Sequence, residues 1–293
     1  PNSVKFEKNI SADLSRLDFT INAMAYNPQK GVVDLFGGEE DIKNGIIKTV
    51  GTPEERFNED ALRILRAFRF ASQLNYKIDE ETENAAISLA DTLCKLSGER
   101  VLSEIKKLAV GKNPFIISTL LDRGALLPFG IGNFRLMPKT FLDVEAEFRP
   151  VIFIFLCEHD NALIKENLKP DNKLLKQLEV LEEFFEIPCP RNKTDLKKIY
   201  SRYPDQIALY LNFVKLCFPL NYLEIRNLTY EILEESEPYL IAHLAIDGNE
   251  IKKLGITSAK IGETLISLLA KVIADPSLNT KEQLLNIISN KNK

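Results

Sequence analysis

Four charged side chains stand at intervals of three residues in one short stretch of the chain. Asp60 is followed by Arg63, Arg66 and Arg69, and no lysine lies among them. An arginine guanidinium is planar and can bond a phosphate or the edge of a base with two N–H groups, which a lysine cannot do. An aspartate adds hydrogen-bond acceptors beside those donors. These four residues could therefore read a nucleobase and neutralise a phosphate.

The apolar residues of this stretch predict how it is oriented. From Glu59 to about Asn75 they recur three and four apart, which is typical of an amphipathic helix, and we expect residues 59–73 to form a single helix. On that helix the charged residues would lie opposite a stripe made of Ala61, Ile64, Leu65, Phe68 and Ala71. The stripe should pack inward, and the charged residues should line an open cleft. The plainer alternative is a solvated helix face with an ion pair between Asp60 and Arg63.

The elements around this stretch change in character near residue 52. Before it, short β-branched runs bounded by turn residues predict strands at 4–6, 31–36 and 46–50, with a helix at 13–24. Beyond it, apolar residues recur at helical spacing in segments that Gly and Pro separate. The further helices predicted in this way span residues 79–96, 98–109, 115–123, 172–186, 193–200, 204–213 and 258–274. A small α/β part therefore leads into a long helical array.

Two further segments carry polar residues among apolar ones. Asp18 and Asn22 lie in the predicted helix 13–24, where they are most simply a cap and a satisfied polar group. Ser97 precedes the predicted helix 98–109 and is a suitable N-cap. Neither segment indicates a function by itself.

Composition limits the class of protein. The chain has 293 residues, of which 45% are hydrophobic and 27% charged, and its formal net charge is −4. Its length suggests about two domains. The negative charge argues against a uniformly basic nucleic-acid-binding surface, although local patches of Lys and Arg can still bind RNA. No apolar run approaches the ~20 residues of a membrane span, and no signal peptide is recognisable, so we expect a cytoplasmic protein.

The cysteines and histidines do not indicate a metal site. The four cysteines are scattered without a Cys-x-x-Cys motif, so reduced thiols are expected. His159-Asp160 spells the dipeptide of a metal-dependent phosphohydrolase, but such a site needs several more ligands and His243 is the only other histidine. Residues 247–249, Asp-Gly-Asn, are most simply a turn.

The order of the motifs is more specific than any one of them. The motifs are Asp-Phe-Thr-Ile-Asn-Ala-Met-Ala at 18–25, Gly-Thr-Pro at 51–53, the arginine stretch at 56–70 and Gly-Glu-Arg-Val at 98–101. In this order they resemble the motifs of class II CCA-adding enzymes, which share a superfamily with bacterial poly(A) polymerases. The resemblance is dense up to about residue 125 and returns between 244 and 282, whereas residues 126–237 match no motif.

The resemblance implies a mainly α fold, in which a partial α+β nucleotidyltransferase palm is followed by an all-helical neck, body and tail. The C-terminal part of the palm would span residues 1–52, the nucleotide-recognition neck 53–125, the body 126–237 and the tRNA-binding tail 238–293. The implied activity is template-independent, metal-dependent addition of CCA, or of CC or A, to the 3′ end of tRNA from CTP and ATP. The alternatives are a bacterial poly(A) polymerase, where the arginine stretch tends to read Glu-Asp-Pro-Val-Arg, and an RNA-binding remnant without catalysis.

The resemblance also implies which residues bind the nucleotide. Asp60 and Arg63 match the pair that recognises the incoming base in the family, and the next two arginines match residues that help to bind the nucleotide. The segment around Asp18 matches a second nucleotide-binding motif. The complete predicted set is Arg16, Asp18, Asn22, Asp60, Arg63, Arg66 and Arg69.

Two departures from the family pattern matter for activity. Leu17 stands where members usually carry a second arginine that helps to bind the nucleotide, and an apolar side chain cannot replace it. The phosphate-binding Gly-Ser loop and the Asp-x-Asp pair that holds Mg²⁺ in the family would precede Pro1, so no catalytic or metal-binding residue is assigned in this chain. We expect residues 1–293 alone not to incorporate nucleotides, because two-metal phosphoryl transfer needs those carboxylates.

Overall fold

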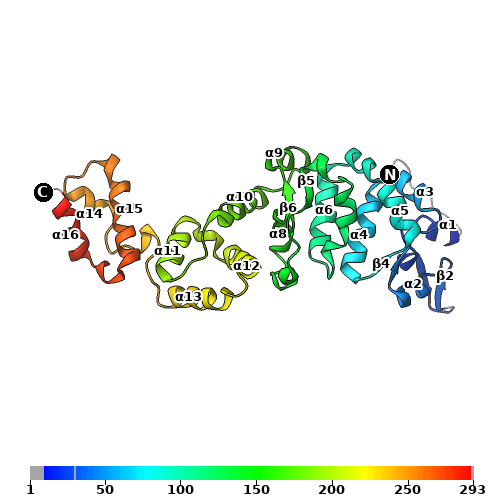
Figure 1. The fold of residues 1–293 in the computed structure, drawn as a ribbon, viewed down its shortest axis with the longest axis horizontal. Helices are drawn as coiled ribbons and strands as arrows, with labels where there is room; N and C mark the ends of the chain where they lie inside the picture. Colours follow the sequence, from blue (N-terminus) through cyan, green and yellow to red (C-terminus); the bar gives the residue numbers. More distant parts are fainter. Residues whose placement is uncertain (1–9, 30, 292–293) are drawn as a thin grey trace. The chain divides into compact units, whose positions relative to one another are not determined.

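A computed structural model describes residues 10–29 and 31–291. It forms two compact units, the first ending at Glu182 and the second beginning at Glu183 (Figure 1). Helices dominate both units, and the strands, which pair in twos, all lie in the first unit. The predicted mainly α fold is therefore confirmed. The predicted strand at 4–6 lies outside the described residues, and the division into palm, neck, body and tail stays a prediction.

The first unit opens with short elements. They are α1 (Ile10–Leu14), the 3₁₀ turn η1 (Thr20–Asn22), β1 (Met24–Asn27), β2 (Gly31–Asp34), α2 (Gly38–Asn44) and β3 (Ile46–Ile47). Strands β1 and β2 pair antiparallel, with Met24 opposite Asp34, whereas β3 pairs parallel with β4 (Lys77–Ile78). Two of the predicted strands, at 31–36 and 46–50, are thus present in shortened form.

The helix predicted at 13–24 is wrong. The helix ends at Leu14, Phe19 has an extended backbone with φ −131° and ψ 151°, and strand β1 begins at Met24. Phe19 is fully buried and forms an isolated antiparallel bridge with Thr49. Its ring packs in a core with Ile47, which lies on β3. Burial of this one aromatic side chain therefore overrides the weak helical preference of the segment.

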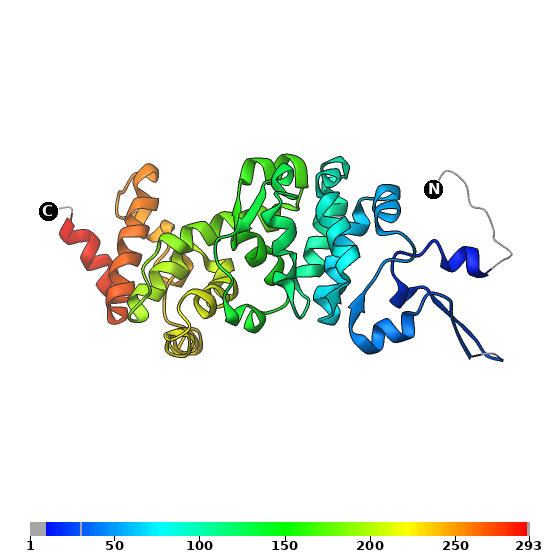
Figure 2. The same ribbon diagram turned by 45° about the vertical axis from the view of Figure 1, so that its right-hand side comes forward.

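A helical layer follows residue 52. Its elements are α3 (Pro53–Glu59), α4 (Leu62–Leu74), α5 (Glu80–Ser88), η2 (Ala90–Lys95), α6 (Gly98–Ala109), η3 (Pro114–Ile117), α7 (Ser118–Asp122) and η4 (Leu127–Phe129). Helix α4 packs along α6, and the β1–β2 hairpin lies beyond α2, away from α6 (Figures 1 and 2). The prediction for 98–109 is confirmed residue for residue, whereas each of the helices predicted at 79–96 and 115–123 is a helix and a 3₁₀ segment.

The rest of the first unit surrounds an aromatic core. Its elements are β5 (Ile131–Phe134), η5 (Lys139–Asp143), α8 (Arg149–Phe155), β6 (Cys157–His159), α9 (Asn161–Leu163), the π-helical turn η6 (Ile164–Leu168) and the first part of α10 (Asn172–Glu186). Phe134 and Phe153 pack edge to face with ring centroids 5.2 Å apart, and Phe115 and Phe141 join them. Edge-to-face packing is the favoured arrangement of aromatic rings.

The second unit is helical throughout the described residues. After the end of α10 come α11 (Lys193–Arg202), η7 (Pro204–Gln206), α12 (Ile207–Cys217), α13 (Tyr222–Glu234), η8 (Ile241–His243), α14 (Gly248–Lys253), α15 (Ser258–Ala274), η9 (Pro276–Leu278) and α16 (Lys281–Lys291). The residues expected to form a turn at 247–249 instead begin α14, because the Asp247 carboxylate accepts the N–H groups of Asn249 and Glu250. Among the helices of the described residues, none is both long and apolar enough to cross a membrane.

Candidate nucleotide-binding site

The arginine stretch forms two helices that meet at Asp60. Asp60 ends α3 with an extended backbone, φ −152° and ψ 106°, and α4 begins at Leu62. The Asp60 Oδ1 atom accepts the Leu62 N–H at 3.0 Å, and the Asp60 carbonyl accepts the Arg63 N–H at 3.0 Å. The predicted single helix 59–73 is therefore wrong, because aspartate competes for the backbone N–H groups of the following turn and so starts a new helix.

The predicted inward face of α4 is confirmed. Ile64, Phe68 and Ala71 are fully buried, Leu65 is 1% exposed, and Ala61 is half-buried. The burial of this stripe orients the arginines to other sides of the helix. The Arg63, Arg66 and Arg69 side chains are 15%, 33% and 11% exposed, so none of them projects into bulk solvent.

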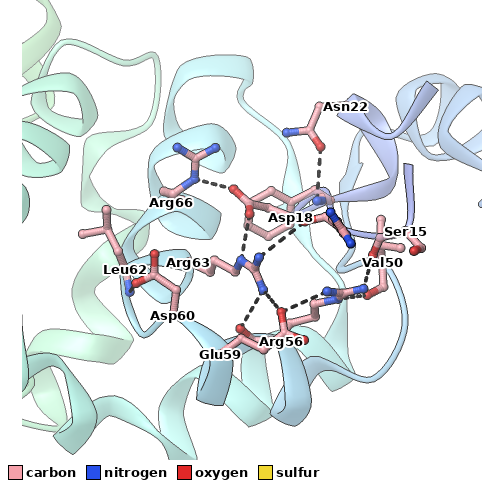
Figure 3. Close-up of polar contacts among 12 residues, drawn as sticks. Ser15, Asp18, Asn22, Val50, Arg56, Glu59, Asp60, Leu62, Arg63 and Arg66 are labelled. Carbon is pink, nitrogen blue, oxygen red and sulfur yellow. Dashed lines mark hydrogen bonds and ion pairs between the residues drawn. The ribbon is translucent and has the colours of Figure 1, made fainter. Parts of the chain in front are cut away.

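Asp18 joins two of these arginines (Figure 3). Its Oδ1 atom accepts the Arg63 Nε–H at 2.8 Å and its Oδ2 atom accepts the Arg66 Nε–H at 2.5 Å. Asp18 comes from the segment before η1, 45 residues before Arg63 in the sequence. One carboxylate thus bridges two guanidinium groups, an arrangement that leaves excess positive charge at this place.

Arg56 and Glu59 complete the cluster around Arg63. The Arg63 Nη1 group donates to the Arg56 carbonyl at 3.1 Å and also contacts Glu59 Oε2, while Arg56 bonds both Glu59 and the Val50 carbonyl, the latter at 2.8 Å (Figure 3). The hydrogen bond from Arg63 lowers the pKa of Glu59 below its ordinary value. Sequence reasoning missed both residues, although they belong to the same stretch, because their roles depend on the helix break.

Asp60 does not pair with Arg63. Its Oδ2 atom accepts a hydrogen bond from Arg100 Nη2 at 2.8 Å, and Arg100 lies in the first turn of α6. The ion pair expected by the plainer alternative, between Asp60 and Arg63, is therefore replaced by two others: Asp60 with Arg100, and Arg63 with Asp18. The sequence contained a signal for Arg100, since it belongs to the Gly-Glu-Arg-Val motif, but not for its partner.

Arg69 is paired differently from Arg63 and Arg66, because its acid partner is Glu104 rather than Asp18. Its guanidinium lies 3.8 Å from the centroid of the Phe70 ring, and its Nε atom is 2.6 Å from Glu104 Oε2 on α6. This contact is an ion pair without hydrogen-bond alignment, since neither atom makes a hydrogen bond. Burial lowers the pKa of Arg69, and Glu104, itself 5% exposed, opposes that effect. The geometry makes Arg69 a link between α4 and α6.

The remaining predicted residues lie in the Asp18 segment. Asn22 uses its Oδ1 atom to accept the Phe19 N–H at 3.2 Å, which closes η1, as expected for a satisfied polar group (Figure 3). Arg16 is exposed, and its carbonyl accepts a long, 3.4 Å hydrogen bond from Arg63 Nη2. Leu17, which stands in place of the usual arginine, is 38% exposed. The structure thus brings Asp18, Arg63 and Arg66 into direct contact, with Asp60, Asn22 and Arg16 around them.

The described residues supply no metal centre. They contain no group of three or more His, Cys, Asp or Glu side chains placed to hold a metal ion. Asp18 is engaged by two arginines, and Asp34 accepts the N–H groups of Phe36, Gly38 and Glu39. Burial tends to raise the pKa of Asp34, but these N–H groups lower it overall. The His159-Asp160 dipeptide is also structural, because His159 pairs with Glu182 and Asp160 caps α9.

Comparisons with known proteins identify families and solved structures to which this chain is similar. Residues 1–48 match the family described as the Poly A polymerase head domain, and residues 75–129 match the probable RNA and SrmB-binding site of polymerase A. The structure is similar to that of the Bacillus stearothermophilus CCA-adding enzyme in complex with CTP, with a TM-score of 0.76 and 24% identity, over 99% of this chain and 78% of that chain. It is also similar to the Thermotoga maritima CCA-adding enzyme complexed with tRNA, with a TM-score of 0.65 and 24% identity, over 96% and 74% of the two chains.

Two sequence relatives are similar over nearly the whole chain. The CCA-adding enzyme of Lactobacillus helveticus is 31% identical over 96% of this chain and 72% of its own length. The CCA-adding enzyme of Staphylococcus epidermidis is 32% identical over 97% of this chain and 74% of its own length. Because both likenesses exceed 30% identity and extend over more than two thirds of each relative, the chain belongs to the family of CCA-adding enzymes.

Proposed function

We propose that this chain selects the incoming nucleotide in a tRNA nucleotidyltransferase that adds C, C and A to the 3′ end of tRNA from CTP and ATP. Its membership of the CCA-adding family supports this function over that of a poly(A) polymerase. Solved relatives are described in complex with CTP, with ATP and with tRNA. The observation that carries the proposal is the cluster of Asp18, Arg63 and Arg66, with Asp60 at the break between α3 and α4.

Asp60 and Arg63 have the hydrogen-bonding groups needed to recognise cytosine and adenine. Both bases carry an exocyclic amino group, which a carboxylate accepts, whereas uracil and guanine present a carbonyl there. Arg63 has five N–H donors. Four of them make its contacts with Asp18, Arg56, Glu59 and Arg16, so one Nη2 donor is left for a ring nitrogen or carbonyl.

Arg66 is suited to bind the anionic part of the nucleotide. It is the most exposed of the three arginines of α4, and only its Nε–H is used by Asp18. Its two Nη groups can therefore pair with a phosphate in the bidentate manner that guanidinium favours. Asp18, Arg16 and Asn22 would orient the nucleotide beside it. Arg69, which is tied to Glu104, would support α4 rather than contact the ligand.

Phosphoryl transfer of this kind uses Mg²⁺ to neutralise the triphosphate, and we propose Mg²⁺ as the metal of this enzyme. The described residues do not fit such an ion, because their carboxylates near the cluster are already bound by arginines or backbone N–H groups.

We propose that the palm, neck, body and tail span 1–52, 53–125, 126–237 and 238–293, and the two family matches support the first two parts. As tRNA maturation takes place in the cytoplasm of bacteria, we propose that location.

Changing Asp60 to Ala tests base selection in the full-length enzyme. We expect use of CTP and ATP to weaken and rejection of UTP to relax, each by about ten- to a hundredfold, because one lost base contact is worth ~1–3 kcal/mol. The measurement is kcat/KM for each nucleotide on tRNA. Asp122, an exposed aspartate at the end of α7, provides the control Asp122→Ala. An Asp60→Ala enzyme that excludes UTP as well as the parent would refute the assignment, and tRNA binding without any incorporation by the parent would favour an RNA-binding protein.

A further inference from the structure

The Asp60 carboxylate is held at both of its oxygens. Oδ1 accepts the Leu62 N–H at 3.0 Å, which comes from the chain immediately after it. Oδ2 accepts from Arg100 Nη2 at 2.8 Å, which comes from α6, 40 residues further along the sequence. The first contact limits the position of one oxygen, and the second restricts the rotation of the carboxylate plane, although both side chains of this pair are partly exposed. Arg100 is therefore the long-range contact that determines how Asp60 presents its remaining lone pairs.

Arg100 is itself placed by close packing of α6. The same first turn contains Gly98, where a Cβ atom would come within 1.8 Å of the Asn167 carbonyl oxygen, so the start of α6 lies directly against the backbone of residues 167–168. Farther along, α6 is joined to α4 by the pair of Glu104 and Arg69. The helix that carries Arg100 is thus anchored on two sides, and its guanidinium reaches Asp60 from a fixed base.

No other described arginine is seen to orient Asp60. Arg63, the nearest in sequence, directs its groups to Asp18, Glu59 and two carbonyls. Arg66 directs its Nε to Asp18. A carboxylate has about four lone-pair sites, and the two contacts of Asp60 use one on each oxygen. Each oxygen therefore keeps one site for the amino group of a base, in a direction that Arg100 sets.

We propose that Arg100 is a positioning residue for base selection, which acts by orienting the Asp60 carboxylate. The inference rests on the proposed role of Asp60. Arg100 need not touch the nucleotide, because its effect on the base passes through the hydrogen bond to Oδ2. When that bond is removed, the carboxylate is held by Leu62 alone and can turn away from the amino group of cytosine or adenine.

The test measures kcat/KM for CTP, ATP and UTP in the full-length enzyme carrying Arg100→Ala. We expect kcat/KM for CTP and ATP to fall about three- to fivefold and the preference for CTP over UTP to fall by a similar factor, because the lost pair is partly exposed. Arg100→Lys keeps the charge but not the planar fork and should recover part of the preference. Lys106→Ala is the matched control, because Lys106 lies on the same helix and pairs with exposed Asp171. It should leave the preference unchanged.

A double substitution separates this inference from the function on which it rests. In an Asp60→Ala background, Arg100→Ala should cause no further loss of preference, because the residue through which it acts is absent. If Asp60→Ala relaxes UTP rejection and Arg100→Ala does not, the positioning role is overturned and the proposed function stands. If Arg100→Ala lowers the preference equally with and without Asp60, Arg100 acts by another route and the inference also fails. If Asp60→Ala has no effect, the proposed function itself fails.

Discussion

Two charged clusters, one in each unit, differ in balance and burial. Around Asp18, three arginines (Arg56, Arg63 and Arg66) meet two carboxylates (Asp18 and Glu59). On α11, two lysines (Lys193 and Lys197) meet three glutamates (Glu231, Glu235 and Glu237). The first cluster has an excess of cations, whereas the second has an excess of acids.

The difference indicates what each cluster is for. Lys197 is only 2% exposed and its Nζ atom lies 2.8 Å from Glu237 Oε2, so this pair ties α11 to the segment after α13. Its lysines are already surrounded by acids, and the glutamates around Lys193, with Glu237 the largest contribution, raise the pKa of that amine. Arg66, in contrast, is 33% exposed with unused donors. The arginine-rich cluster can therefore bind a further anion. In the acid-rich cluster the lysines are already paired with glutamates and have no such role.

The largest expected effect comes from Glu237→Ala. Removing this acid leaves Lys197 charged and buried, which should lower the free energy of unfolding of the second unit by about 3–5 kcal/mol. Hydrogen exchange of the α11 and α13 amides measures the loss in that unit separately from the rest of the chain.

Two controls accompany that measurement. Glu231→Ala should cost less than about 1 kcal/mol, because Glu231 is 51% exposed and Lys193 keeps two other acids. Lys197→Met should also cost less than Glu237→Ala, because Glu237 retains Lys193 at 2.8 Å. Equal losses for Glu231→Ala and Glu237→Ala would contradict the view that the buried pair holds the unit together.

A smaller effect is expected from the arginines of α4, where two similar substitutions should have different consequences. Arg66→Ala should raise KM for CTP and ATP about ten- to a hundredfold, with little change in Tm, because a charge-assisted contact is lost at a partly exposed place. Arg69→Ala should lower stability by about 2 kcal/mol with a smaller change in KM, because Glu104 is 5% exposed and keeps only Lys107 at 3.1 Å. Steady-state kinetics and thermal unfolding of both variants would show the contrast. If Arg69→Ala raised KM more than Arg66→Ala did, the roles assigned to the two residues would be contradicted.

The smallest expected effect is a pH dependence in the second unit. Burial tends to raise the pKa of Glu237, but hydrogen bonds from Lys193 and Lys197 lower it overall below the ordinary value of 4.5. A depressed carboxyl pKa contributes stability that is present above pH 4.5 and is lost as the pH falls through the folded-state value. The loss should be on the order of 1 kcal/mol, since solvent partly screens the acid and a protonated glutamate still accepts a hydrogen bond. In the parent, the protection of the α11 amides against hydrogen exchange should fall as the pH is lowered from about 6 to about 3. The Glu237→Gln variant should show a flatter pH dependence of this protection.

Local periodicity was sufficient to predict several parts of the molecule. The apolar stripe of α4 and the bounds of α6, α10 and α15 agree with the sequence reasoning. The order of the motifs also identified the family that the relatives confirm. These features depend on residues a few positions apart, whose spacing alone decides which side of a helix is apolar.

Partners far apart in the sequence were decided only by the tertiary structure. The plainer alternative from the sequence was an ion pair between Asp60 and Arg63, yet Asp60 ends α3 and pairs with Arg100, while Asp18 pairs with Arg63. Phe19 likewise leaves its predicted helix because it is buried beside Ile47. An ion pair between residues 40 or more positions apart depends on how the segment before η1, the α3–α4 junction and α6 pack together. Burial of one aromatic ring outweighs the small differences in helix propensity that a short segment carries.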